Sequence, residues 1–184
     1  MQLSVRLTVI TAGLLLAATT GNAQQVVFGL AGGGTYSDFS HPDTPSRWGY
    51  TAGLFVGVKS YRSLNMLDVS YTQKGGEGAR IDYVEASVTG GGLARGGGGS
   101  GARPYIGFSV AFPVSCDAPS APLNAFCDNT NTEWGIPVGL MLGKFKPTGG
   151  FIGLDARYTI AINDASLNVY NNTWMFRLMI GRPK

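Results

Sequence analysis

One polar segment near the start of the chain holds side chains that could cooperate in hydrolysis. His41 lies close to Asp38, Ser40 and Asp43. A serine, a histidine and an aspartate cleave ester or amide bonds when a rigid frame holds them within hydrogen-bonding distance. Here the serine lacks the glycine-flanked motif that exposes a nucleophile, and Asp43 precedes a Thr-Pro pair that is typical of a turn. We interpret His41 as a solvated loop residue and expect no catalytic residues.

The chain has two cysteines, Cys116 and Cys127, and one histidine. In an exported protein, a close pair of cysteines most simply forms a disulfide that closes a short loop. Metal binding is the alternative, but a second ligand pair is missing and His41 lies far away in the sequence. The run Gly96–Gly101 has the composition of a phosphate-binding loop without the Gly-Lys-Ser/Thr sequence that such a loop requires. We therefore expect a disulfide, no metal and no cofactor.

Residues 1–23 have the organisation of a secretory signal peptide. Arg6 supplies a positive charge, an apolar run extends from Leu7 to Ala18, and Gly21-Asn22-Ala23 offers a small-x-small cleavage site. A membrane-anchoring helix is the alternative, although this apolar run is shorter than the about 20 residues that a spanning helix needs. We expect the mature chain to begin at Gln24, and residues 24–184 to form one barrel domain.

The rest of the chain alternates apolar and polar residues in eight segments, which is the period of a β-strand. Segments of about 10 residues with one apolar face have the length and polarity of strands that cross a bilayer at a tilt. Glycine is abundant, at 28 residues, and charged residues make up only 14% of the chain, a composition that a closed barrel tolerates. The segment Trp48–Lys59 shows the pattern best, with an apolar face formed by Trp48, Tyr50, Ala52, Leu54, Val56 and Val58.

The sequence therefore predicts an all-β fold, an eight-stranded antiparallel up-and-down transmembrane β-barrel. Most connections alternate between long and short, as in bacterial outer-membrane barrels with long external loops, short periplasmic turns and both termini in the periplasm. Two links depart from this rule, because Gly90–Gly101 is long for a periplasmic turn and Gly75–Ala79 is short for an external loop. The expected strands are Val26–Tyr36, Trp48–Tyr61, Leu64–Lys74, Arg80–Thr89, Ala102–Phe112, Glu133–Phe145, Gly150–Ile162 and Asn172–Gly181.

Aromatic residues recur at the expected outer end of seven strands, on the apolar face. Tyrosine and tryptophan favour the membrane interface because each combines an apolar body with a polar tip. Strand Arg80–Thr89 is the exception, because its Tyr83 falls on the polar face. The predicted outer aromatic girdle consists of Tyr36, Trp48, Tyr71, Phe112, Trp134, Tyr158 and Trp174.

The opposite face of the strands carries charged residues, which we expect to point into the barrel. A charge that faces lipid is costly, whereas an inward charge can be paired or hydrated. An eight-stranded barrel is narrow enough for side chains to fill it, so we expect a plugged lumen with ion pairs such as Arg157–Glu85 and Arg177–Asp68. We interpret these pairs as structural, the alternative being a relay for protons or ions. The predicted lumen network consists of Lys59, Asp68, Lys74, Glu85, Arg103, Asp155, Arg157 and Arg177.

Three segments resemble the PorT-like family of outer-membrane β-barrels. They are Asp68-Val-Ser-Tyr-Thr-Gln-Lys-Gly75, Ile81-Asp-Tyr-Val-Glu85 and Gly153-Leu-Asp-Ala-Arg-Tyr158. The first looks like that family's strand ending in Tyr-x-Gln-Lys-Gly, the second like its Leu-x-Tyr-Leu-Glu strand, and the third like its Leu-Asp-x-Arg-Tyr strand. The chain departs from the family in having Ala86-Ser87 where a proline usually follows the glutamate, and in ending without a terminal aromatic residue. The resemblance implies the fold and an outer-membrane location.

These observations predict a small non-enzymatic protein of the bacterial outer membrane with a structural or surface-interaction role. Its expected partners are the lipid of the outer membrane and a protein bound through the loop Pro113–Thr132. The formal net charge of +3 gives no electrostatic reason to expect nucleic acid. Two alternatives stay open: a lipid- or peptide-processing enzyme at the outer rim, and a soluble periplasmic lipocalin-like barrel. In a lipocalin-like barrel the apolar face would point inward.

Overall fold

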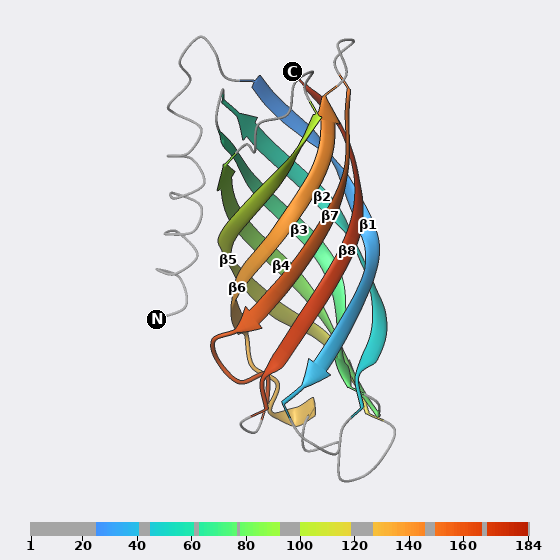
Figure 1. Ribbon diagram of the computed structural model, residues 1–184. Helices are drawn as coiled ribbons and strands as arrows, with labels where there is room; N and C mark the ends of the chain where they lie inside the picture. The colour runs from blue at the N-terminus through green and yellow to red at the C-terminus, as the bar shows by residue number, and fades with distance from the viewer. Residues whose placement is uncertain are drawn as a thin grey trace, which may run out of the picture.

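The alternating segments form strands that pair in sequence order and close on themselves, which leaves no sheet edge unpaired. In the computed structural model every strand is antiparallel to its neighbours, and the last strand pairs with the first (Figure 1). The predicted eight-stranded antiparallel up-and-down barrel is confirmed. The strands are β1 (Gln25–Phe39), β2 (Arg47–Lys59), β3 (Ser63–Gly76), β4 (Ala79–Gly92), β5 (Ser100–Asp117), β6 (Glu133–Phe145), β7 (Phe151–Ala161) and β8 (Asn171–Pro183).

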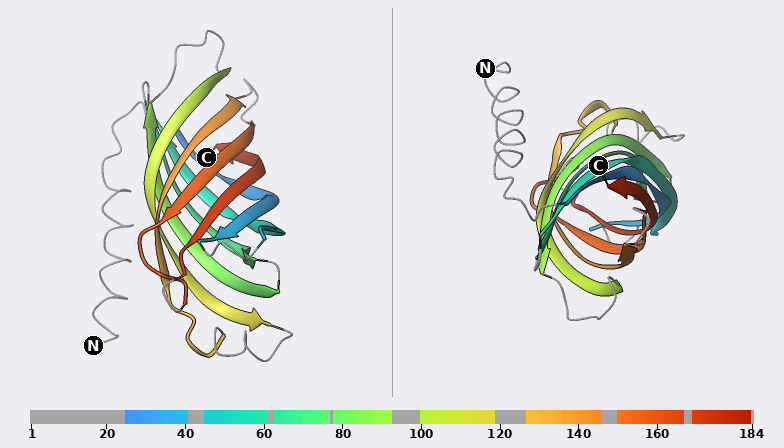
Figure 2. Two further views of the ribbon diagram at one scale, coloured as in Figure 1. Left: turned by 60° about the horizontal axis from the view of Figure 1, so that its bottom comes forward. Right: turned by 90° about the horizontal axis from the view of Figure 1, so that it is seen from above.

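The structure describes residues 25–40, 45–60, 63–76, 78–92, 100–118, 127–145, 150–166 and 169–183. The predicted signal peptide and His41 lie outside these residues. Within them, we find no helix that is long and apolar enough to span a membrane. We call the end of the barrel at which β1 begins and β8 ends the terminal end, and the opposite one the loop end (Figure 1). Seen along its axis, the barrel is a closed ring of tilted strands (Figure 2).

Strand β5 is longer than the sequence predicts. It continues from Phe112 to Asp117, so the first five residues of the expected loop Pro113–Thr132 belong to a strand. The beginning of β4 explains the extension, because Ile81 pairs with Cys116 and Arg80 with Asp117. A register shift at Asp82/Tyr83 accommodates this extra pairing. The last residues of β5 therefore project beyond the first residue of β6.

The apolar face of each strand points out of the barrel. Leu54 is 64% exposed and Leu178 is 46% exposed, and Ile136 is partly exposed. A lipocalin-like barrel would bury these side chains around its axis. The observed orientation is the opposite, so the lipocalin-like alternative is wrong.

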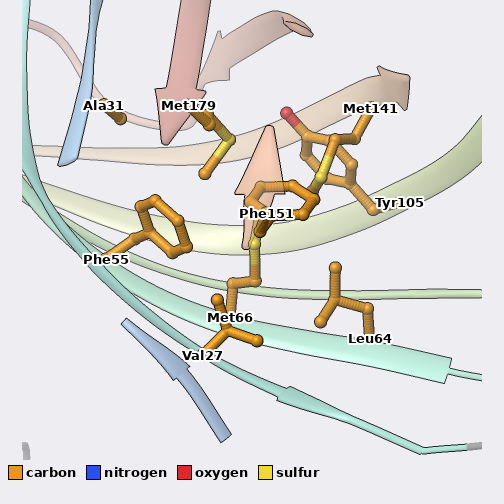
Figure 3. Packing of buried hydrophobic residues seen from close by; sticks show 9 residues of the cluster. All are labelled: Val27, Ala31, Phe55, Leu64, Met66, Tyr105, Met141, Phe151 and Met179. Carbon is orange, nitrogen blue, oxygen red and sulfur yellow. The ribbon is translucent and has the colours of Figure 1, made fainter. Parts of the chain in front are cut away.

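The half of the lumen near the terminal end is packed with apolar side chains (Figure 3). The rings of Phe55 on β2 and Phe151 on β7 meet edge to face at a centroid distance of 6.0 Å. Methionines fill the space around them, since an unbranched flexible side chain adapts to irregular gaps. The cluster consists of Val27, Ala31, Phe55, Leu64, Met66, Tyr105, Met141, Phe151 and Met179. The sequence pattern predicts charges in the lumen and does not predict this apolar packing.

Glycines in the wall let inward side chains reach past the neighbouring strand. Tyr105 on β5 pairs with Gly139 on β6, and Gly139 pairs with Arg157 on β7. Because Gly139 has no side chain, the Tyr105 hydroxyl passes over β6 and contacts Asp155 and Arg157. Thr35 on β1 likewise donates a hydrogen bond of 2.6 Å to the Gln73 carbonyl on β3. We call such positions glycine slots.

The substitution Gly139→Ala tests this role. A Cβ at position 139 would lie 2.5 Å from the ring Cζ of Tyr105 and 2.7 Å from the carbonyl oxygen of Ala156. Forcing an atom into a packed site costs about 1–3 kcal/mol, and we expect a loss of that size in urea unfolding of the barrel in lipid vesicles. Gly32→Ala is the control, because its Cβ would meet only the Thr51 carbonyl at 3.6 Å. Equal stability of the two variants would contradict the role of Gly139 as a glycine slot.

Candidate functional site

The structure places the predicted lumen charges on the inner face of the barrel. Seven of the eight are buried, with at most 3% of their surface exposed. The eighth, Lys59, is only partly buried and lies at the terminal end of β2. The buried seven are Asp68, Lys74, Glu85, Arg103, Asp155, Arg157 and Arg177.

Four of these residues, Asp68, Asp155, Arg157 and Arg177, form one connected group, which we call the four-charge cluster. Asp68 accepts hydrogen bonds from Arg157 at 2.9 Å and from Arg177 at 3.1 Å. Asp155 accepts two more from Arg177, at 2.8 and 2.9 Å. The expected pair Arg177–Asp68 is present. Two carboxylates and two guanidinium groups balance each other, which is the condition under which buried charge is tolerated.

The four-charge cluster joins opposite walls of the barrel. Asp68 lies on β3 and Arg157 on β7, and four steps separate these strands in a ring of eight. Arg157 also donates to the hydroxyls of Ser87 at 3.0 Å and Tyr105 at 3.1 Å. Every guanidinium nitrogen of Arg157 therefore has a partner, as a buried cation requires.

The expected pair Arg157–Glu85 is wrong. Glu85 lies 2.8 Å from the Nζ atom of Lys74, and Arg157 binds Asp68 and Tyr105 instead. The two residues share a face, as the alternation indicates, but they lie in different layers of the lumen. Alternation gives the face of a side chain and not its height in a tilted strand, which is why the pairing could not be derived.

A second group, which we call the three-charge cluster, consists of Lys74, Glu85 and Glu133. The Nζ atom of Lys74 lies 2.8 Å from Glu85 and 3.4 Å from Glu133. The Tyr83 hydroxyl donates a hydrogen bond to Glu133, and the Asn171 amide donates another at 3.2 Å. Two carboxylates thus share one ammonium group and two neutral donors.

Several members of these clusters were not in the predicted network. For Glu133 the signal was available, because the same alternation that turns Trp134 outward turns Glu133 inward. Tyr83 was correctly placed on the polar face. A local pattern could not reveal its role as a donor, or those of Tyr105, Ser87 and Asn171, because their acceptors lie 19 to 50 residues away along the chain.

A small hollow lies beside the three-charge cluster. Its empty volume is about 180 Å³, and its lining includes Lys74, Glu133, Thr159 and Asn171. That volume includes space open to solvent, and the hollow has no room for a water-sized molecule, whereas sites for small molecules usually measure about 300–1,000 Å³. Among the residues that the structure describes, no group of three or more histidine, cysteine or acidic side chains could hold a metal ion.

A second apolar cluster lies at the loop end. It combines the end of β1, the beginning of β4 and the outer part of β5, with Val169 packed against it. The predicted disulfide between Cys116 and Cys127 is present, and Cys116 packs on this cluster. The disulfide therefore attaches the segment after β5 to the rim of the barrel. The buried members of this second apolar cluster are Phe39, Ala79, Ile81, Tyr83 and Ala111.

The seven residues of the expected aromatic girdle lie on the outer face toward the loop end, where several touch across strands. Tyr36 is opposite both Trp48 and Trp174, and its ring centroid lies 5.0 Å from that of Trp48. Tyr158 and Trp174 are 4.8 Å apart. Trp48, Phe112, Trp174 and Tyr36 are exposed, while Tyr71, Trp134 and Tyr158 are partly buried.

Solved structures with the same architecture come from bacteria. The crystal structure of the outer membrane protein OprG from Pseudomonas aeruginosa is similar with a TM-score of 0.56 and 13% identity, covering 88% of this chain and 97% of that one. Neisserial surface protein A is similar with a TM-score of 0.55 and 12% identity, covering 83% and 96%. At such identities the likeness concerns the fold. No protein-family model matches the chain, and no curated protein matches its sequence, so the PorT-like resemblance stays a prediction.

The substitution Asp68→Asn tests whether the four-charge cluster stabilises the barrel. It removes the carboxylate that two arginines share and leaves buried positive charge without compensation. Breaking one partner of a buried ion pair costs about 3–5 kcal/mol, and we expect a loss in that range in urea unfolding in vesicles. Asp117→Asn is the control, because its side chain is 66% exposed and lies 3.9 Å from Arg80; its effect should stay below about 0.5 kcal/mol. A small effect at Asp68 would contradict the prediction.

Proposed function

We propose that this protein is a small barrel of the bacterial outer membrane, with the loop end outside the cell and the terminal end in the periplasm. The observation that carries the proposal is the division of side chains between the two faces. Large apolar residues such as Leu30, Leu54 and Leu154 are 59–64% exposed, while the charged residues in the middle of the strands, such as Asp68, Asp155 and Arg177, are buried. Water would disfavour such a surface, and the hydrocarbon of a bilayer favours it.

The dimensions of the barrel support this location. Its strands are 11 to 18 residues long, and about 9–11 residues are needed to cross a bilayer at a tilt. The aromatic girdle lies toward the loop end, at the level where one interface of the membrane would be. Export through the predicted signal peptide, with cleavage after Ala23, and kinship with the PorT-like barrels are parts of the same proposal.

The proposed role is structural or concerned with interactions at the surface, and not enzymatic. The lumen is occupied by the four-charge cluster, the three-charge cluster and two apolar clusters, which supports a barrel that is closed to ions. The segment 113–132 is the proposed contact with a protein partner, because β5 carries it past the rim and the disulfide fixes its base. A partner that binds equally well after deletion of residues 118–126 would contradict this contact.

The substitution Leu54→Arg tests the membrane location. Leu54 lies near the middle of β2 and points outward, where arginine facing hydrocarbon costs about 2–4 kcal/mol. We expect that loss in vesicle-based unfolding, and recovery of the wild type in the outer-membrane fraction. Val114→Arg is the control, because Val114 is 55% exposed on the projecting part of β5, and its cost should be about 0–1 kcal/mol. Recovery of the wild-type protein in the soluble periplasm without detergent would contradict the proposal.

Recording in planar lipid bilayers tests the closed lumen. Because Arg157 and Asp68 join β7 to β3 across the axis, we expect no steady single-channel current from the wild-type barrel at neutral pH. A general porin recorded under the same conditions is the positive control. Steady, stepwise conductance by the wild type would show that the lumen is open.

A further inference from the structure

Apart from the four-charge and three-charge clusters, the charged side chains at the two ends of the barrel differ in sign. Each of the eight strands has two residues nearest the terminal end. Together these residues include three cations and no carboxylate. The sequence continues this bias, because no acidic residue occurs between Asp43 and Asp68, between Glu85 and Asp117, or between Glu133 and Asp155. The three cations are Lys59, Lys144 and Arg182.

The loop end has the opposite character. Two arginines, Arg47 and Arg80, begin or flank strands there, and Arg80 is paired with Asp82 and Asp117. Acidic residues outnumber these cations in the described segments of that end. Apart from the three-charge cluster, they are Asp38, Asp82, Asp117, Asp128 and Asp164.

Two of the terminal-end cations stand on the outer face, directly beyond the apolar band. Lys144 on β6 continues the outward row of Leu142, and Arg182 on β8 continues that of Ile180. Both cations are exposed. Lys144 pairs with Ile152 on β7, and Ile152 pairs with Ile180, so one strand separates the two cations.

The spacing of the two cations suits a single ligand. Strands lie about 4.8 Å apart, so β6 and β8 are separated by roughly 10 Å around the barrel. Arg182 also lies two residues beyond Ile180, roughly 7 Å further along β8, so the backbones at the two cations are roughly 12 Å apart. Lysine and arginine side chains can lay their stems on apolar surface and extend their charged heads to the membrane interface. A phosphate positioned over β7 is within reach of both heads, with acyl chains along Ile152 and Ile180, which are 42% and 55% exposed. Phe28 on β1, opposite Arg182 in the ladder, borders this area.

We propose that the outer face around Lys144 and Arg182 binds the headgroup of an anionic phospholipid in the leaflet at the terminal end. The inference rests on the proposed membrane location and adds a lipid class to it. Phosphatidylglycerol carries a net negative charge that the two cations attract, whereas the ammonium group of phosphatidylethanolamine compensates its phosphate. The acidic loop end repels the same headgroups, so the preference belongs to one end of the barrel.

Native mass spectrometry of the detergent-solubilised full chain, with added phosphatidylglycerol or phosphatidylethanolamine of identical acyl chains, tests the proposal. The wild type should retain phosphatidylglycerol more strongly. The variants Lys144→Gln and Arg182→Gln should each weaken that retention roughly fivefold at low salt, the effect of about one charge near an anionic surface. Arg47→Gln removes one positive charge at the loop end and is the matched control, which should retain phosphatidylglycerol as the wild type does.

Equal retention of the two lipids by the wild type would overturn the inference. So would an equal loss in Arg47→Gln, because the attraction would then follow net charge and not this face. Insertion into vesicles of zwitterionic phosphatidylcholine separates this result from the membrane proposal itself. A barrel that inserts there but shows no lipid preference contradicts the inference alone, whereas a chain that does not insert contradicts the proposed location.

Discussion

The ion pair between Arg157 and Asp68 is the contact on which the interior of this barrel depends. It joins β7 to β3, which face each other across the axis, and the guanidinium of Arg177 binds the same carboxylate from β8. Charges removed from water are costly unless they are fully paired. The barrel satisfies this requirement because it is narrow: with eight strands, side chains from opposite walls meet at hydrogen-bonding distance.

The same narrowness explains the abundance of glycine. Long inward side chains need space, and the wall provides it where a strand has no side chain. Tyr105 reaches Asp155 across Gly139, and the ring of Phe55 reaches Gly181 of β8 beyond Gly29 of β1. A glycine in an ordinary strand weakens it. Here the closed hydrogen-bonded ladder fixes the backbone, and the missing side chain becomes the space through which the lumen is packed.

The sequence predicts the faces of this fold better than its contacts. Alternation with period two is local, so it placed Leu54 outward and Asp68 inward without knowledge of any other strand. Pairing across the lumen depends on strand tilt and on the relative height of side chains along the barrel axis. A shared face therefore predicts the pair Arg157–Glu85, whereas the structure has Arg157–Asp68. The extension of β5 to Asp117 also escaped prediction, because it follows from pairing with β4 and not from a local pattern.

The cost of removing charges from water determines where the charged residues of this chain lie. In the four-charge cluster opposite charges cancel, and in the three-charge cluster a single excess carboxylate is bound by Lys74, Tyr83 and Asn171. The lumen therefore contributes little net charge to the field outside the barrel, since paired charges of opposite sign offset each other at a distance. What remains is the contrast between the cationic terminal end and the acidic loop end. In a membrane, charge can be placed only at the two interfaces or inside the barrel. The contrast in charge between the two ends therefore makes the barrel electrostatically asymmetric along its axis.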